Sequence, residues 1–246
     1  MSESQPIMLL TGASRGIGHA TVKLFQERGW RILTVSRQPF DPACQWPAAR
    51  WAHIQADLAD LAAIEGLAAE VRSRLPDGKL HGLVNNAGIS PKGPGGKRLG
   101  VLETDAFAWT TVLNVNLVST ALLVRALLPE LEAAHGSIVN VTSIVGSRVH
   151  PFAGVAYAAS KAGLAALTRE IAAELGARNV RCNAIAPGEI KTAILSPGTD
   201  DLVARNVPMR RLGEPREVAE TIYFLCSEAS SYITGAEIHI SGGQHA

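Results

Sequence analysis

The chain of 246 residues has few cysteines and almost no excess of charge of either sign. Its three cysteines, Cys44, Cys182 and Cys226, are too few and too far apart for a disulfide framework or a zinc knuckle. Lys plus Arg is 23 and Asp plus Glu is 22, so a formal net charge of +1 provides no global basic field for nucleic acid. We therefore expect reduced thiols, no metal site and no nucleic-acid partner.

Long hydrophobic runs are also lacking. No segment reaches the roughly 18 consecutive apolar residues of a membrane-spanning helix. The first residues, Met1–Pro6, carry no basic stretch, and the apolar run Ile7–Thr11 is far too short for a signal sequence. These features predict a cytoplasmic protein without a membrane partner.

The sequence does contain strand-sized apolar runs that alternate with helical segments. Seven runs rich in Val, Ile or Leu are expected to be buried strands: Ile7–Thr11, Arg31–Ser36, Trp51–Gln55, Leu80–Asn85, Ser137–Ser143, Val180–Ala186 and Ala236–Ser241. A period of 3.6 residues predicts helices over Leu58–Arg74, Leu113–Leu131 and Tyr157–Ala177. This alternation predicts an α/β fold, a Rossmann-type doubly wound parallel sheet of about seven strands with helices on both faces.

The composition gives no sign of a division into domains. No Pro/Gly/Ser-rich linker is long enough to separate two parts, which predicts a single domain over residues 1–246. Between the sixth and seventh runs, Pro197-Gly198 and Pro208 predict a small excursion from the sheet toward the substrate side, at about residues 189–210.

A glycine-rich turn, Thr11-Gly-Ala-Ser-Arg-Gly-Ile-Gly18, follows the first predicted strand and opens a helix to about Arg28. Glycines allow a tight turn and a close approach to a ligand, and the helix start offers unpaired N–H groups to a pyrophosphate. The spacing G-x3-G-x-G differs from the common G-x-G-x-x-G fingerprint, so the glycines alone are a weak signal. The prediction of dinucleotide binding rests on their position at the turn between the first predicted strand and the following helix.

Two arginines bear on which dinucleotide is bound. Arg37 stands at the end of the second predicted strand, where NAD-binding sheets usually carry Asp or Glu for the ribose hydroxyls. Arg15 lies within the glycine turn. Because guanidinium groups suit a 2′-phosphate, the sequence favours NADP(H) over NAD(H).

Tyr157 and Lys161 form a candidate proton-transfer pair. Their four-residue spacing places them on one face of a predicted helix. A free tyrosine titrates at about pH 10, and a neighbouring ammonium lowers that pKa. Ser143 and Asn85-Asn-Ala-Gly88 end two predicted strands at the same rim of the sheet, where open parallel sheets bind their ligands.

Taken together, these motifs resemble those of the short-chain dehydrogenases/reductases, and the resemblance covers about residues 6–243. It is carried by Thr11–Gly18, Asp57-Leu58, Asn85–Gly88, Asn114-Val-Asn116, Ser143, Tyr157, Lys161 and Pro187-Gly188 with Thr192. The resemblance implies an enzyme that transfers hydride between a nicotinamide and a small ketone or secondary alcohol.

The resemblance also implies a role for each catalytic residue. Tyr157 would act as the acid in reduction and as the base in oxidation. Lys161 would bind the ribose hydroxyls and lower the pKa of Tyr157, and Ser143 would hydrogen-bond the substrate oxygen. Asn116, rather than Asn114, matches the residue that supports a water in the proton relay.

The implied cofactor contacts come from every part of the chain. Asp57 would meet the adenine, and Ile190 and Thr192 would hold the nicotinamide amide. The full expected set is Gly12, Ser14, Arg15, Gly16, Ile17, Gly18, Arg37, Asp57, Leu58, Asn86, Ala87, Gly88, Tyr157, Lys161, Pro187, Gly188, Ile190 and Thr192.

Assembly and substrate are less strongly specified. Related enzymes pair the helix of Tyr157 and the helix before it across a twofold axis, which implies a homotetramer, with a dimer as the alternative. Candidate pocket residues are His150, Phe152, the 90–100 loop with Lys92, Lys97 and Arg98, and residues 189–208.

Two other functions remain open. Pro208–Pro215 and Arg178 resemble the 3-oxoacyl-[acyl carrier protein] reductases, although Leu131–His135 lacks the basic residue usual there. A nucleotide-sensing protein without catalysis is a minor alternative, because such proteins often lose a catalytic residue and this chain keeps all of them.

Overall fold

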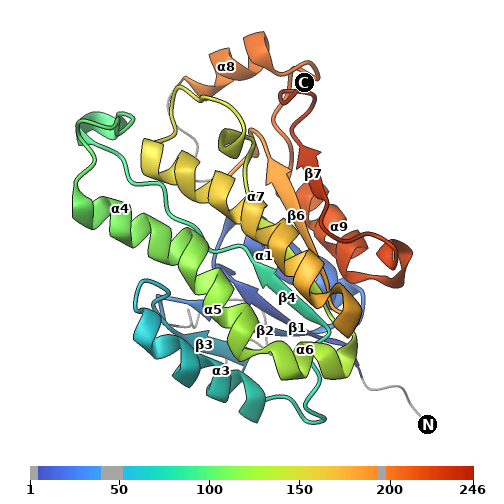
Figure 1. Ribbon diagram of the computed structural model, residues 1–246. Helices are drawn as coiled ribbons and strands as arrows, with labels where there is room; N and C mark the ends of the chain where they lie inside the picture. Colours follow the sequence, from blue (N-terminus) through green and yellow to red (C-terminus); the bar gives the residue numbers. More distant parts are fainter. Residues whose placement is uncertain (1–4, 40–51, 193–197) are drawn as a thin grey trace.

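The computed structural model describes residues 5–39, 52–192 and 198–246, and seven strands among them form one parallel sheet (Figure 1). The strands are β1 (Ile7–Thr11), β2 (Arg31–Ser36), β3 (His53–Gln55), β4 (Gly82–Asn85), β5 (Ser137–Val141), β6 (Arg181–Pro187) and β7 (Glu237–Ile240). Their order is β3-β2-β1-β4-β5-β6-β7, with every neighbouring pair parallel. The predicted Rossmann-type sheet is confirmed.

Helices cover both faces of this sheet (Figure 1). One face carries α1 (Gly16–Glu27) and α9 (Pro215–Cys226), which pack against each other. The other carries α3 (Ile64–Ser73), α4 (Ala106–Leu113), α5 (Ser119–Ala126), α6 (Leu128–Ala134) and α7 (Val155–Leu175). The predicted excursion after β6 contains α8 (Thr199–Asn206), and its residues 193–197 lie outside the described ranges.

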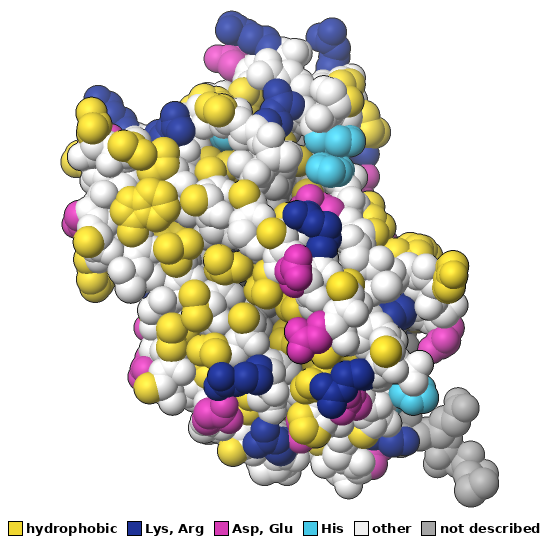
Figure 2. All heavy atoms as spheres, viewed as in Figure 1, with side chains coloured by type: hydrophobic (Ala, Val, Ile, Leu, Met, Phe, Trp, Pro, Cys, Tyr) yellow, Lys and Arg dark blue, Asp and Glu magenta, His cyan; other side chains and the backbone are white. Residues whose placement is uncertain are grey.

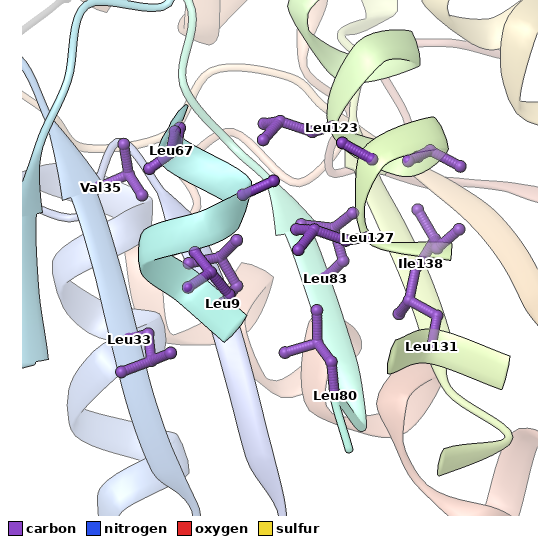
Figure 3. Close-up of a cluster of buried hydrophobic side chains, with 14 of the residues drawn as sticks. Leu9, Leu33, Val35, Leu67, Leu80, Leu83, Leu123, Leu127, Leu131 and Ile138 are labelled. Atoms are coloured by element: carbon purple, nitrogen blue, oxygen red, sulfur yellow. The ribbon is translucent and has the colours of Figure 1, made fainter. Parts of the chain in front are cut away.

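The strand side chains alternate between two hydrophobic clusters. Leu9 and Leu83 point into a cluster with α3, α5 and α6 (Figure 3). Their neighbours Leu10 and Val84 point into a second cluster with α1 and α9. Because both faces of these strands are buried, the runs are apolar almost without interruption, which is the pattern that identified them in the sequence.

The sheet creates a crevice where its order reverses. From β1 the chain moves outward to β2 and β3, then returns to place β4 on the other side of β1. The connections that follow β1 and β4 lead to opposite faces, since α1 and the α4–α5 layer cover different faces. Their loops therefore diverge at the carboxyl ends of the strands, where ligands bind in sheets of this kind.

The predicted helix over Leu113–Leu131 is wrong in both its bounds and its continuity. α4 begins at Ala106, because the Asp105 carboxylate caps it by accepting the Ala108 N–H. A π-helical turn follows over Asn114–Val118, and α5 ends at Ala126 before a new helix that has Pro in its first turn. Periodicity alone reports none of these breaks.

The other predicted elements differ from the observed ones mainly at their ends. Every observed strand boundary lies within two residues of the predicted one. The predicted helix over Leu58–Arg74 begins instead with a short 3₁₀ turn at Leu61–Ala63, capped by Asp60, and continues as α3. Trp51 and Cys44 lie outside the described residues, while Cys182 and Cys226 are buried free thiols.

Candidate active site

The glycine turn between β1 and α1 packs directly against the loop after β4. Asn86 Nδ2 donates to the carbonyl oxygens of Gly12 at 2.8 Å and Thr11 at 3.0 Å. Thr11 Oγ1 accepts the N–H groups of Asn86 at 3.1 Å and Ala87 at 3.0 Å. A Cβ on Gly18 would lie 2.2 Å from the Gly12 oxygen, and Gly12 itself has a φ of +72°. Backbone geometry therefore requires glycine at both positions.

A cavity of about 480 Å³ opens beside this turn. Within the described residues no side chain caps the start of α1, so its first N–H groups are available to a ligand. The predicted cofactor residues that line the cavity are Gly12, Ser14, Arg15, Gly16, Ile17, Arg37, Asp57, Leu58, Asn86, Ala87, Gly88 and Thr192. Gly18 is buried behind the turn, where it serves the close backbone approach. The cavity and the glycine cradle fit a dinucleotide.

A second cavity, of about 220 Å³, continues from the first. Ile17, Asn86, Gly88 and Thr192 line both cavities and so join them. The other predicted residues along its wall are Ser143, Tyr157, Lys161, Pro187, Gly188 and Ile190. The structure thus brings the predicted nicotinamide contacts and the predicted proton-transfer group to one place.

Ser143, Tyr157 and Lys161 come from two neighbouring elements. Ser143 follows β5, and its hydroxyl lies beside the phenol of Tyr157, which is in the first turn of α7. One turn further on, Lys161 is only 3% exposed, and its Nζ donates to the carbonyl of Val141 at 2.6 Å. This Nζ lies 5.7 Å from the centre of the Tyr157 ring.

Burial dominates the electrostatics of this pair. Burial lowers the pKa of Lys161 to about 8. Burial also has the largest effect on the pKa of Tyr157 and raises it. The neighbouring Ser143 hydroxyl lowers this pKa, and the Glu189 carboxylate raises it. The expected net lowering of the Tyr157 pKa is therefore not found, because desolvation of the phenolate outweighs the favourable contacts.

Asn116 lines neither cavity and is buried in the π-helical turn. Its Nδ2 donates to the Ile89 carbonyl and to Ser160 Oγ, each at 3.0 Å, and its Oδ1 accepts the Ile89 N–H at 2.9 Å. Asn116 thus fixes the backbone just beyond Gly88. Its expected role with a relay water stays a prediction.

Two features of the site were missed in the sequence. The clamp made by Thr11 joins residues that lie 75 positions apart in the chain. Glu189 faces the second cavity, 2.7 Å from His150, although it was included only within a broad candidate range. A carboxylate directly after the strand-ending Pro187-Gly188 was the available signal. Among the described residues, no group of three or more His, Cys, Asp or Glu could hold a metal ion.

A glycine turn above the crevice of a parallel sheet, joined to a cavity with a Tyr–Lys pair, defines a nicotinamide-dependent oxidoreductase of the Rossmann type. A family model described as enoyl-(acyl carrier protein) reductase matches residues 12–245. The chain belongs to the short-chain dehydrogenase/reductase family, whose members act on CH–OH or carbonyl groups with a nicotinamide cofactor.

Three relatives illustrate this membership. Protein FixR of Bradyrhizobium diazoefficiens is 57% identical over 240 residues, which are 97% of this chain and 86% of that protein. A short-chain dehydrogenase/reductase from Brucella ovis, solved with partially ordered NAD, has 55% identity and a TM-score of 0.85, covering 97% of this chain and 100% of that one. The 3-oxoacyl-[acyl-carrier protein] reductase of Brucella melitensis has 35% identity and a TM-score of 0.89, covering 100% and 93%.

Replacing Gly18 by alanine is expected to abolish dinucleotide binding. The new Cβ would lie 2.2 Å from the Gly12 oxygen and 2.7 Å from Asn86 Nδ2, and so would force the turn away from the β4 loop. The matched control is Gly66→Ala in α3, where a Cβ meets nothing within 4 Å and helix propensity favours alanine by about 1 kcal/mol. Titration of NADPH and NADH fluorescence, with the Tm of each variant, measures the effect. Wild-type affinity in the Gly18 variant would contradict this assignment.

Proposed function

We propose that the chain is an NADP(H)-dependent carbonyl reductase or alcohol dehydrogenase that acts on a small ketone or secondary alcohol in the cytoplasm. One observation carries this proposal: Ser143, Tyr157 and Lys161 line a cavity that is continuous with the dinucleotide cavity. At about 220 Å³ this cavity is smaller than the roughly 300–1,000 Å³ of sites for drug-sized ligands, which favours a small substrate.

The site residues divide the proton-transfer work between them. The bound dinucleotide supplies or accepts the hydride. Ser143 hydrogen-bonds the substrate oxygen, and Tyr157 gives that oxygen a proton in reduction and removes it in oxidation. Because burial raises the pKa of Tyr157, the phenol keeps its proton at neutral pH and is ready to donate it. Lys161 lines the same cavity as Tyr157 and would hold the ribose hydroxyls of the cofactor close to the phenol.

Replacing Tyr157 by phenylalanine tests the proton-transfer assignment. We expect kcat to fall by about 100-fold or more, since general acid catalysis typically contributes that much, while cofactor affinity is retained. The matched control is Tyr232→Phe, at a fully exposed side chain. The readout is the loss of NADPH absorbance over a panel of ketones and aldehydes. Undiminished turnover by the Tyr157 variant would refute the mechanism.

Two exposed arginines support a preference for NADP(H). Arg15, in the glycine turn, and Arg37, directly after β2, both line the dinucleotide cavity. The NAD bound by the Brucella ovis relative is the observation that favours NAD(H) instead. The two arginines decide our proposal because each guanidinium can form charge-assisted hydrogen bonds to a 2′-phosphate.

Replacing Arg37 by aspartate tests this preference. A hydrogen bond to a charged group contributes about 1.5–3 kcal/mol, so the ratio of kcat/KM for NADPH to that for NADH should fall about tenfold or more. Lys23→Asp, on the exposed side of α1, changes charge by the same amount and serves as the control. An unchanged ratio in the Arg37 variant would show that Arg37 does not select the cofactor.

Reduction of 3-oxoacyl thioesters is the second candidate. The 35%-identical Brucella melitensis enzyme favours it. However, Arg178 forms an ion pair with Glu132, in the segment that lacks the expected basic residue, so its charge is partly neutralised for an acidic carrier protein. Turnover of acetoacetyl thioesters that increases with carrier protein would favour this candidate. Binding of NADPH without turnover of any substrate would instead favour a nucleotide-sensing role.

An exposed apolar helix supports a homotetramer, with a dimer as the alternative. The helical run Ala106–Ala126, through α4 and α5, has a mean hydropathy of 1.5 over its most apolar window, of which only 39% is buried. Figure 2 shows hydrophobic side chains gathered over this part of the surface. Its length and composition would also suit a membrane span, but the run packs on α3 and α7 within the chain. We therefore propose that its outer side contacts another subunit.

Replacing Phe107 by aspartate is expected to yield a smaller assembly. This side chain is 79% exposed on α4, and a charge there would be buried without a partner in a subunit interface. Val149→Asp, at an equally exposed apolar residue outside the helix, is the control. Light scattering should give four chains for the wild-type protein. A monomeric wild-type protein, or an unchanged mass in the Phe107 variant, would contradict the proposed interface.

A further inference from the structure

We propose that the substrate is a zwitterion, a small amino acid carrying the reacting hydroxyl or oxo group, with its ammonium at Glu189 and its carboxylate at Lys92. The inference rests on the proposed function, because it names the substrate class of the same cavity. It follows from two opposite charges that line the cavity without neutralising each other.

A chain of hydrogen bonds holds these charges in place. Lys92 Nζ donates to the carbonyl of Phe152, and the Phe152 N–H donates to His150 Nδ1 at 3.2 Å. His150 Nε2 lies 2.7 Å from Glu189 Oε1, and Gln244 Nε2 donates to the same oxygen at 3.5 Å. The chain joins four separate segments of the protein, so the charged groups are positioned before a ligand arrives.

The geometry at His150 fixes the charge of its pair with Glu189. Because Nδ1 accepts the Phe152 N–H, a proton on Nδ1 would face another proton. The ring therefore carries its proton on Nε2 and donates it to Glu189. The imidazole is neutral in this arrangement, and the pair keeps the full negative charge of the carboxylate.

Glu189 has one oxygen free to bind a ligand. Oε1 is occupied by His150 and Gln244, whereas no described residue donates to Oε2. The side chain is only 10% exposed, so its free oxygen is the part of Glu189 left to meet a ligand in the cavity. A carboxylate oxygen without a protein donor binds a cationic donor more favourably than a neutral group.

Lys92 supplies the opposite charge. Its ammonium uses one proton on the Phe152 carbonyl and has two left. Burial lowers the pKa of Lys92 and Glu189 opposes that effect, so the two charges are close enough to interact. They form no ion pair within 4.0 Å among the described contacts, which leaves space for a ligand between them. The third charged group of the cavity, Lys161, already donates to the Val141 carbonyl and would hold the cofactor ribose in the proposed function.

Only a ligand with both charges satisfies both residues. A neutral alcohol would remove water from Glu189 and Lys92 and return no charge to either. The carboxylate of a hydroxy acid would pair with Lys92 but be repelled by Glu189. The ammonium of an amino alcohol would pair with Glu189 but be repelled by Lys92. A zwitterion neutralises the two sites together, and its hydroxyl carbon is then held near Ser143 and Tyr157.

Four alcohols of matched size test the inference with the cofactor-loaded enzyme. Threonine carries both charges, 3-hydroxybutyrate lacks the ammonium, 1-amino-2-propanol lacks the carboxylate, and 2-butanol lacks both. 4-Hydroxynorvaline extends the series by one carbon, and a polyol represents neutral hydrogen-bonding substrates. We expect kcat/KM for one of the two zwitterions to exceed that of every other compound by at least tenfold.

Substitutions then assign each charge to its residue. Glu189→Gln should remove the preference for the zwitterion over the hydroxy acid, and Lys92→Met should remove the preference over the amino alcohol. Glu170→Gln and Lys79→Met, at exposed residues away from the cavity, are the matched controls and should retain both preferences.

A binding measurement separates this inference from the proposed function. Calorimetry on the complex with the reduced cofactor compares norvaline, which cannot react, with pentanoate and butylamine. Norvaline binding that is tenfold tighter and depends on Glu189 supports the inference even if no compound is turned over. Turnover of 2-butanol or 3-hydroxybutyrate equal to that of the zwitterions overturns the inference and leaves the proposed function intact. The inference is also overturned if the protein shows no preference for a zwitterion in either binding or turnover.

Discussion

The active site depends on one close backbone contact, between the glycine turn after β1 and the loop after β4. The Asn86 amide bonds both Thr11 and Gly12, and this is possible because no Cβ stands between the two segments. The same loop continues to Gly88. A Cβ added at Gly88 would lie 3.4 Å from Lys161 Nζ and 3.5 Å from Asn116 Oδ1. A single contact thus sets the position of the dinucleotide cradle relative to the proton-transfer residues.

Desolvation, more than attraction between charges, governs the proton-transfer groups. The ammonium of Lys161 is fixed on a β5 carbonyl 5.7 Å from the centre of the Tyr157 ring, and burial is the largest effect on the pKa of the phenol. The phenol consequently holds its proton more firmly than a free tyrosine does. A raised pKa keeps the phenol protonated but makes it a weaker acid, and a cofactor bound in the adjoining cavity would change this balance by adding its own charge.

The sequence predicted the sheet well because its strands are buried on both faces. Ile7–Thr11 and Arg31–Ser36 have the predicted bounds, since an apolar run ends where burial ends. The helix over Leu113–Leu131 was wrong because periodicity does not report a one-residue widening of a turn. That π-helical turn carries Asn116 toward Ile89, so the error fell on a functional segment, where such turns are often found.

The two halves of the site differ in how far a sequence can define them. The dinucleotide half is built from backbone, so a short glycine motif on a known strand–helix turn is enough to identify it. The substrate half is built from side chains that meet only in the fold: Lys92 and Phe152 are 60 positions apart, and His150 and Glu189 are 39 apart. Such contacts leave no local pattern in the sequence. Substrate selection in this fold therefore has to be argued from the charges that face the cavity.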